Sequence, residues 1–266
     1  MPNFLFNHSL SIEKKIRNAD SLVLFLDYDG TLVPFKDKPT EVRTPEKIKK
    51  ILRELITNPK ILVVIVTGRP QHDIKQLLKI KGLSFIALHG LQTETSNGEQ
   101  YSWKQANQTR FLIQRIKKTM QEELSQETGA FLEDKDLTVV LHYRLLHPDR
   151  ISDLQKKFKN IVQSNDKEKI LEIISGAKVL EVRPKGWNKG KAIELFLAKQ
   201  QKKNILPLYI GDDITDEDAF RILGKRGISI YVMNESTRKT AAQYWVKNPD
   251  DIYFFLKSLA RISQKR

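Results

Sequence analysis

Two acidic segments in this sequence each follow an apolar run of strand length, and both could take part in chemistry on an anionic substrate. Asp27 and Asp29 lie in the segment DYDGT directly after the apolar run 22–26, and Asp212 lies in the segment GDDITD directly after the run 206–210. In an open α/β sheet, ligands bind beyond the carboxyl ends of the strands. Carboxylates gathered at that edge need a nearby cation, and oxygen ligands without a thiolate favour Mg²⁺. The two segments therefore predict a magnesium site.

Two further residues suit the negative charge of a phosphoryl group. Thr67 ends a third apolar run, 61–66, and its hydroxyl can donate a hydrogen bond. Lys189 lies at the expected start of a helix, in the segment GWNKG, and a lysine binds phosphate as a point charge. Mg²⁺, Lys189 and Thr67 would converge on the charge that a transferring phosphoryl group spreads over its oxygens. The four segments together predict phosphoryl transfer.

Apolar spacing along the chain predicts the elements that position these residues. Continuous apolar runs that end in turn residues are typical of strands buried on both faces of a parallel sheet, and apolar positions at helical spacing predict the helices between them. The first α/β region is expected to have strands at 22–26, 61–66 and 85–88 and helices at 44–56 and 71–80. The second is expected to have strands at 206–210 and 228–232 and helices at 189–201, 216–223 and 249–261.

Between these two regions the pattern changes to helix, strand, strand, repeated once. The expected helices are 105–125 and 148–163, and the expected strands are 130–133, 137–143, 170–174 and 178–182. This order is typical of a small α+β unit with an antiparallel sheet. The predicted fold class is therefore α/β, with a discontinuous parallel-sheet core at 1–100 and 185–266 and an inserted α+β domain at 101–184.

Composition limits the class of protein. The chain has 266 residues, of which 40% are apolar, and it has no cysteine. It can bury a sizeable core, but it can form no disulfide, thiolate metal site or cysteine nucleophile. The formal charge of +14 would suit nucleic-acid binding, whereas the alternation of lysines with apolar residues favours a basic charge spread over solvated helix faces. The first residues do not resemble a signal peptide and no apolar run could span a bilayer, so we expect a cytoplasmic protein.

In this order, the segments that contain Asp27, Thr67, Lys189 and Asp212 resemble the four motifs of the haloacid dehalogenase (HAD) superfamily of phosphatases. The resemblance implies a HAD-like Rossmannoid core with an inserted cap domain. It implies that Asp27 is a nucleophile that becomes an aspartyl phosphate, and that Asp29 acts first as general acid and then as general base. It also implies that Mg²⁺ is held by Asp27, the main-chain carbonyl of Asp29, and Asp212.

Three residues near these motifs allow more than one interpretation. Asp213 is expected behind the metal ligands, where it would orient a metal-bound water or Lys189. Asp216 could act there too, but the segment 215–218 is also typical of a capped helix start. His89 follows a strand and resembles a family segment near the cleft, yet a single histidine in that position is also typical of a structural residue.

Alternating polar residues mark three expected strands of the inserted domain. The pairs that share a strand face are Glu133 with Lys135, His142 with Arg144, and Glu181 with Arg183. Carboxylates accept from the hydroxyls of a sugar, and lysine or arginine donates to them. Exposed sheet faces with residues paired across strands would show the same spacing, so the spacing alone leaves both interpretations open.

These segments also resemble the cap of the trehalose-phosphate phosphatases. The segments that carry this resemblance are FLEDK at 131–135, LHYR at 141–144 and LEVRP at 180–184, together with GWNKG at 186–190 and GDDITDED at 211–218. The resemblance implies magnesium-dependent hydrolysis of trehalose 6-phosphate. The residues that it implies for disaccharide binding are Glu133, Lys135, His142, Arg144 and Glu181, whereas Arg183 could equally be structural.

Two alternatives to this function stay open. A HAD phosphatase for another sugar phosphate, such as sucrose, glucosylglycerol or mannosylglycerate phosphate, would share the core motifs and differ in the cap. A more distant alternative is an anion- or nucleic-acid-binding protein on the same scaffold, although pure binding needs no nucleophile. We expect a monomer whose partner is a small sugar phosphate, with neither nucleic acid nor a membrane involved.

Overall fold

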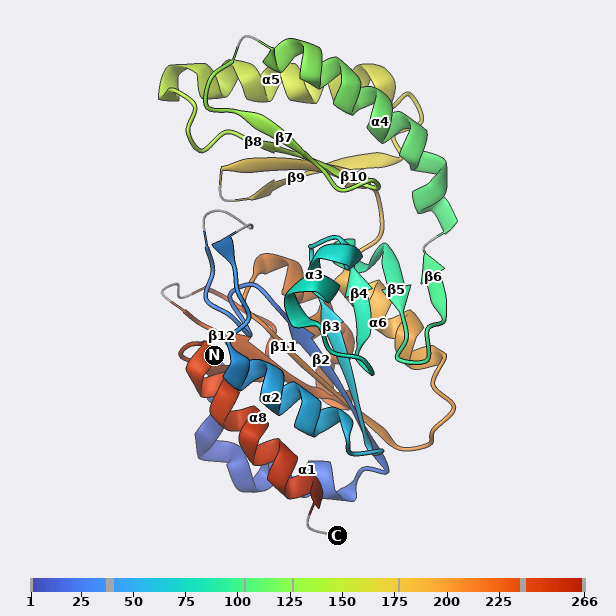
Figure 1. Cartoon of the computed structure of the whole chain (residues 1–266), viewed down its shortest axis with the longest axis vertical. Coiled ribbons are helices and arrows are strands. Elements are labelled where there is room, and N and C mark those ends of the chain that lie inside the picture. Colours follow the sequence, from blue (N-terminus) through green and yellow to red (C-terminus); the bar gives the residue numbers. More distant parts are fainter. Residues whose placement is uncertain are drawn as a thin grey trace. The chain divides into compact units, whose positions relative to one another are not determined.

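The computed structural model describes residues 2–36, 41–102, 104–125, 127–176, 178–234 and 238–264 (Figure 1). The chain forms two compact units: a large unit of Met1–Tyr101 with Asn188–Arg266, and a small unit of Ser102–Trp187. The large unit is built on a mainly parallel sheet, and the small unit combines helices with an antiparallel sheet. The predicted α/β fold class is thereby confirmed.

The sheet of the large unit has nine strands among the described residues, in the order β1-β13-β12-β11-β2-β3-β4-β5-β6. Neighbouring strands from β1 to β4 run parallel, and β5 is antiparallel to β4. The strands are β1 (Asn3–Phe4), β2 (Ser21–Asp27), β3 (Ile61–Val66), β4 (Ser84–Ala87), β5 (Gln92–Glu94), β6 (Gln100–Ser102), β11 (Ile205–Gly211), β12 (Ile228–Val232) and β13 (Tyr244–Val246). The shortest of them, β1, β5, β6 and β13, were not predicted, because strands of two or three residues show no recognisable alternation.

The central strands are apolar throughout because helices cover both faces of this sheet (Figure 1). Leu24 of β2 lies in one hydrophobic cluster with Leu52 of α2 and Leu256 of α8. The next residue, Phe25, points to the other face and packs edge-to-face on Phe196 of α6, with 5.7 Å between ring centroids. The helices of this unit are α1 (Ser9–Asn18), α2 (Glu46–Ile56), α3 (Gln71–Leu78), α6 (Lys189–Ala198), α7 (Glu217–Leu223) and α8 (Pro249–Gln264), with short 3₁₀ helices η1 (Leu5–His8), η3 (Leu88–Gly90), η4 (Ile214–Asp216) and η5 (Gly224–Arg226).

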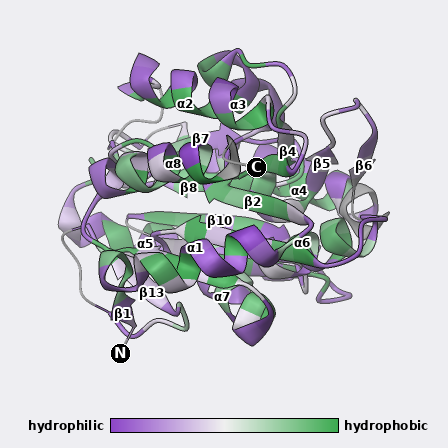
Figure 2. Cartoon of the chain, turned by 90° about the horizontal axis from the view of Figure 1, so that it is seen from below, coloured by the Kyte–Doolittle hydropathy of each residue, from purple (hydrophilic) through white to green (hydrophobic). Residues whose placement is uncertain are grey.

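The surface helices of this unit are amphipathic. Figure 2 shows both hydrophilic and hydrophobic residues along α1 and α2, as expected for helices with one face on a core. In α2, for example, Ile48, Leu52 and Leu55 are buried, whereas Lys50 and Arg53 are exposed. None of the helices in the described part of the chain is long and apolar enough to cross a membrane.

The small unit is a four-stranded sheet with helices on one face (Figure 1). Its strands pair antiparallel in the order β7-β8-β10-β9. The elements are α4 (Lys104–Leu124), β7 (Phe131–Asp134), β8 (Val139–His142), α5 (Pro148–Asn165), β9 (Leu171–Gly176) and β10 (Val179–Pro184). Leu141 of β8 and Leu180 of β10 form one core with Ile116 of α4 and Phe158 of α5. Residues that alternate with these leucines therefore lie on the opposite face of the sheet.

The parallel register of the large unit brings the predicted motifs to one edge. Asp27, the last residue of β2, pairs with Val66 at the end of β3, and Leu26 pairs with Ile210 near the end of β11. The residues that follow these three strands therefore meet beyond their carboxyl ends, which is where ligands bind in open α/β sheets.

Candidate active site

Asp27 and Asp212 approach each other because the turn after β2 contains a glycine. Gly30 has a φ of +83°, a left-handed conformation that favours glycine, and its N–H donates to the carbonyl of Val33 at 2.8 Å. A Cβ at Gly30 would lie only 2.0 Å from Oδ2 of Asp212. The turn thus leaves room for the Asp212 carboxylate against the main chain of the first motif.

Two side chains fix the Asp212 carboxylate in this position. The hydroxyl of Thr31 donates to Oδ1 at 3.2 Å, and the amide of Asn234 donates to Oδ2 at 3.2 Å and to the carbonyl of Gly30 at 3.0 Å. Sequence reasoning missed Asn234. Its position two residues after the end of β12, another parallel strand, was the signal that could have indicated it.

Lys189 lies buried between two carboxylates at the start of α6. Its Nζ donates to Oδ1 of Asp27 at 2.8 Å and to Oδ1 of Asp216 at 2.7 Å. Burial by itself would lower the pKa of Lys189, but the charges of Asp216 and Asp27 together raise it above its ordinary value. The lysine therefore stays charged and places a fixed positive charge beside Asp27.

Asp216 uses both of its oxygens to hold other groups of the protein. Besides Lys189, Oδ1 accepts from the hydroxyl of Tyr209 at 2.6 Å, and Oδ2 accepts from the main-chain N–H of Asp213 at 2.8 Å. Burial raises the pKa of Tyr209 well above its ordinary value, so the hydroxyl stays protonated and donates. Asp216 thus completes the capped start of η4, which is one of the two interpretations left open by the sequence, and its contact with Lys189 also supports the other, a role in orienting that lysine.

The side chain of Asp213 makes local contacts at the start of a helix. Its carboxylate accepts from the N–H of Ile214 at 2.7 Å and from the hydroxyl of Thr215 at 3.3 Å, which caps the 3₁₀ helix η4. The Asp213 side chain makes these contacts in an exposed position. Three residues later, at the end of η4, Asp216 contacts the buried Lys189. That Asp213 orients a metal-bound water or Lys189 stays a prediction.

The acid cluster has a donor set that fits a hard divalent cation. Oxygens of Asp27, Asp212 and Asp216 lie within 4.8 Å of one another. When all three carboxylates are ionised, Lys189 balances only one of their charges. Burial raises the pKa of Asp27 well above its ordinary value; Lys189 opposes this shift, and the charges of Asp216 and Asp212 add to it. Burial, together with Asp216 and Asp213, raises the pKa of Asp212 to about 7. Neighbouring carboxylates repel one another when they are ionised, and a bound cation offsets this repulsion. Carboxylate oxygens are also the ligands that Mg²⁺ prefers.

Asp29 is held by an arginine that sequence reasoning missed. Nε of Arg69 donates to Oδ2 of Asp29 at 2.6 Å, and Nη2 donates to Oδ1 at 2.6 Å. Thr67 is buried, and its hydroxyl accepts from the N–H of Arg69 at 3.1 Å, which leaves the hydroxyl proton available for donation. The signal for Arg69 was its place in the same strand-end segment as Thr67.

The small unit brings together three of the five residues predicted for sugar binding. Nε2 of His142 lies 2.9 Å from Oε2 of Glu133, and Nζ of Lys135 lies 4.0 Å from the same oxygen. The ring of Phe131, which the sequence had not indicated, stacks on His142 with 4.5 Å between centroids and 5° between planes.

Of the other two predicted residues, one lies in the sheet and one lies in a turn outside it. Glu181 of β10 shares a cross-strand row with Glu133, because both pair with Val140 of β8. Arg144 follows β8 in an exposed turn. Arg183 forms an ion pair with Glu172 on the neighbouring strand at 2.9 Å, which favours the structural interpretation of that residue.

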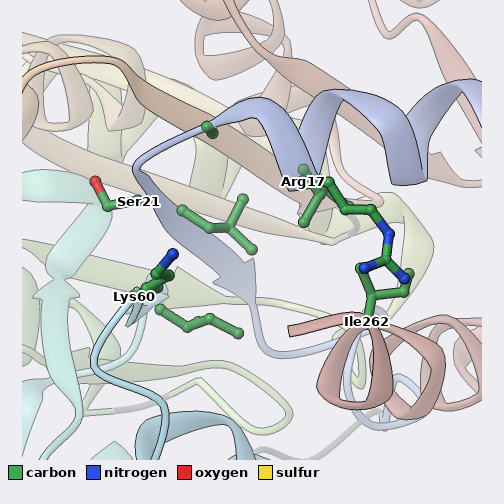
Figure 3. Close-up of a pocket in the computed structure, with 8 residues that line it drawn as sticks. Arg17, Ser21, Lys60 and Ile262 are labelled. Carbon is green, nitrogen blue, oxygen red and sulfur yellow. The ribbon is translucent and has the colours of Figure 1, made fainter. Parts of the chain in front are cut away.

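A cavity of about 40 Å³ lies at the opposite edge of the large sheet (Figure 3). Arg17, Ser21, Lys60 and Ile262 are among the residues that line it, together with further apolar side chains. Ser21 and Asp27 are the first and last residues of β2, so at about 3.3 Å per residue the cavity lies roughly 20 Å from the acid cluster. It is separate from the predicted chemistry.

The chain is similar to known proteins in both sequence and fold. The family model described as trehalose-phosphatase matches residues 25–250. A relative from Arabidopsis thaliana, named as a probable trehalose-phosphate phosphatase E, is 33% identical over 92% of this chain and 72% of its own length. A solved trehalose-6-phosphate phosphatase related protein has 26% identity and a TM-score of 0.79, covering 92% of this chain and 100% of its own. The C-terminal domain of the trehalose-6-phosphate phosphatase of C. albicans has the same fold, with 24% identity, a TM-score of 0.82 and 98% coverage of both chains.

Proposed function

Because this chain belongs to the trehalose-phosphatase family, we propose that it hydrolyses trehalose 6-phosphate to trehalose and phosphate, with Mg²⁺ and through an aspartyl phosphate on Asp27. The observation that carries the proposal is the buried contact of Lys189 with Asp27 at 2.8 Å, beside the carboxylate of Asp212. A carboxylate held against a fixed ammonium group suits attack on a phosphoryl dianion, since the cation offsets the charge on both.

In the first step, the Asp27 carboxylate forms a bond to phosphorus while the bond from phosphorus to the sugar oxygen breaks. Asp29 gives its proton to that sugar oxygen, so trehalose leaves neutral. Lys189 stays beside the phosphoryl oxygens because Asp216 binds it and the hydroxyl of Tyr209 in turn binds Asp216. The hydroxyl of Thr67 is the expected donor to one of those oxygens.

In the second step, a water molecule attacks the phosphorus of the aspartyl phosphate. Asp29, now ionised, takes a proton from that water, and the bond between phosphorus and the Asp27 oxygen breaks. The products are inorganic phosphate and the original Asp27 carboxylate. Mg²⁺, held by Asp27, the main-chain carbonyl of Asp29, and Asp212, would supply further positive charge against the phosphoryl oxygens.

We assign substrate specificity to the small unit. Glu133, His142 and Lys135 form a polar group on one face of its sheet, with the exposed ring of Phe131 stacked beside them. Carboxylate, imidazole and ammonium groups can bind the hydroxyls of a disaccharide, and an aromatic face can pack on its ring carbons. We further assign this chain a monomeric state, the cytoplasm as its location, and no nucleic-acid partner.

The experiment that tests this function measures phosphate release from a panel of sugar phosphates, with Mg²⁺ and with EDTA. We expect release from trehalose 6-phosphate that EDTA abolishes. Asp27→Asn should abolish turnover and the phosphorylated protein seen by mass spectrometry after acid quench, while its circular dichroism spectrum shows that the fold stays intact. The control is Asp20→Asn, an exposed residue just before the same strand, which should change neither.

Three outcomes would contradict parts of the proposal. Release from another sugar phosphate alone would keep the chemistry and overturn the substrate. Turnover by Asp27→Asn would overturn the nucleophile. Equal activity with EDTA would overturn the role of Mg²⁺.

A further inference from the structure

Arg69 makes a two-pronged contact with the carboxylate that the proposed mechanism uses for proton transfer. Its Nε and Nη2 each donate to a different oxygen of Asp29 at 2.6 Å. We propose that Arg69 is a positioning residue for Asp29, and that the left-handed turn at Leu88 and His89 holds Arg69 in place for this task. The inference rests on the proposed function, because it assumes that Asp29 is the general acid and base.

The geometry of the pair indicates that Arg69 orients the Asp29 carboxylate and does more than neutralise its charge. A guanidinium group that meets a carboxylate with two parallel hydrogen bonds fixes both its position and its plane, which a lysine cannot do. The Arg69 side chain is 11% exposed and that of Asp29 27%, so the pair is partly shielded from water. The guanidinium also lies 5.6 Å from the ring centroid of Tyr28, which limits its freedom on that side.

A neighbouring turn holds the main chain around Arg69. The N–H of Leu88 donates to the carbonyl of Arg69 at 3.1 Å, and the N–H of His89 donates to the carbonyl of Thr67 at 3.0 Å. The imidazole of His89 packs directly on Gly68, where a Cβ would lie 2.4 Å from Nε2. The turn after β4 therefore contacts all three residues of the loop after β3, Thr67 to Arg69.

These contacts depend on an unfavourable backbone conformation in the turn after β4. Leu88 and His89 have φ values of 50° and 53°, so two successive residues other than glycine adopt the left-handed region. Such conformations are costly for residues with a Cβ, persist only where the surroundings enforce them, and gather at functional sites. Here the enforced turn delivers the two N–H groups that fix the loop of Arg69.

The chemical consequence concerns the first step of the reaction. Both oxygens of Asp29 accept from Arg69, so the bond to one oxygen must weaken while that oxygen carries the proton, and it forms again when Asp29 gives the proton to the leaving oxygen. The other bond keeps the carboxylate aligned. Loss of Arg69 should therefore lower kcat/KM for substrates whose leaving group must be protonated, and should change it little for substrates whose leaving group departs unprotonated.

The test is kcat/KM for a series of aryl phosphates and for trehalose 6-phosphate, because kcat/KM reports the steps up to departure of the leaving group. Arg69→Ala should lower kcat/KM for phenyl phosphate and trehalose 6-phosphate by about 10²-fold, but for p-nitrophenyl phosphate, which leaves unprotonated, by less than about threefold. Arg69→Lys should restore only part of the loss. The control is Arg53→Ala, which removes an exposed ion pair with Glu46 in the same unit and should change no substrate.

The outcomes separate this inference from the proposed function. If Asp29→Asn itself shows no dependence on the leaving group, the general-acid role fails. If Asp29→Asn shows that dependence, but Arg69→Ala lowers kcat/KM equally for all substrates or for none of them, the positioning role of Arg69 is overturned.

The contribution of the turn has its own test. His89→Asn keeps a residue that tolerates the left-handed region but removes the ring from Gly68. It should reproduce the leaving-group dependence with a smaller loss, about tenfold for phenyl phosphate. Its matched control is Lys79→Asn, an exposed residue with the same φ of 53° at the end of α3. If His89→Asn behaves like this control, the role of the turn is overturned.

Discussion

A single methyl group added at Gly30 would collide with the carboxylate of Asp212. The ideal Cβ lies 2.0 Å from Oδ2 and 2.5 Å from Cγ, whereas the nearest ordinary approach of carbon to oxygen is about 3.3 Å. In Gly30→Ala the carboxylate must therefore move by about 1.3 Å from its present position in the proposed cation site.

The displacement sets the expected size of the effect. Misplacement of a catalytic group by about 1 Å can cost roughly 10²-fold in rate, so kcat should fall by about that factor. The concentration of Mg²⁺ at half activity should rise by about tenfold or more, because Asp212 would no longer be held by Thr31 and Asn234. Alanine at the left-handed φ of +83° should also cost about 1–2 kcal/mol of unfolding free energy.

Gly98→Ala supplies the matched control in the same unit. Gly98 has a φ of +88°, and a Cβ there would meet nothing within 4 Å. It therefore carries the same backbone cost without the collision. The assay is phosphate release from trehalose 6-phosphate over a series of Mg²⁺ concentrations, with thermal unfolding of both variants measured alongside.

Two results would refute this reasoning. If Gly30→Ala keeps the kcat and Mg²⁺ requirement of Gly98→Ala, then Asp212 is either free to move without cost or outside the site. If both variants lose activity equally, the loss comes from the backbone and not from the carboxylate.

Two further predictions concern the buried lysine and the small unit. Asp216→Asn removes a buried partner of Lys189, so calorimetry should show about 3–5 kcal/mol less unfolding free energy. The control Asp218→Asn breaks an exposed ion pair and should lower the unfolding free energy by less than about 1 kcal/mol. Equal losses in the two variants would contradict the importance of the buried contact. Glu133→Gln should raise KM for trehalose 6-phosphate by about tenfold without changing KM for p-nitrophenyl phosphate, because a charged acceptor is lost, and Glu123→Gln on α4 is its control. An equal rise for both substrates would count against a sugar-binding role.

The positions of Asp27 and Asp212 could be predicted because each follows an apolar run of strand length. An apolar run buried on both faces must be a central strand, and parallel strands in an α/β sheet end at one edge. The position of Asp27 at the end of β2 and of Asp212 just after β11 follows from this alone. The side chains around them required the register and the turns as well.

Asp213 and Asp216 show where spacing stops being informative. Three acids within five residues could each face the site, and the choice depends on a single 3₁₀ turn, Ile214–Asp216, that the sequence pattern did not reveal. Arg69 shows a second limit, because a long side chain can reach many partners and its contact with Asp29 spans 40 residues. The left-handed turn at His89 is a third, since residues with a Cβ rarely adopt that conformation.

The buried position of Lys189 is better explained by chemistry than by stability. Removing an ammonium group and two carboxylates from water costs several kcal/mol per ion, and apolar residues of similar volume often stabilise a core at least as well. In the proposed reaction, however, the phosphoryl group that moves to Asp27 needs a positive charge that does not have to reorganise. Asp216 and Tyr209 supply that fixation from behind, because Asp216 binds the lysine and Tyr209 binds Asp216. Lys189 can therefore keep its position when Asp27 becomes phosphorylated, which a lysine held by Asp27 alone could not do.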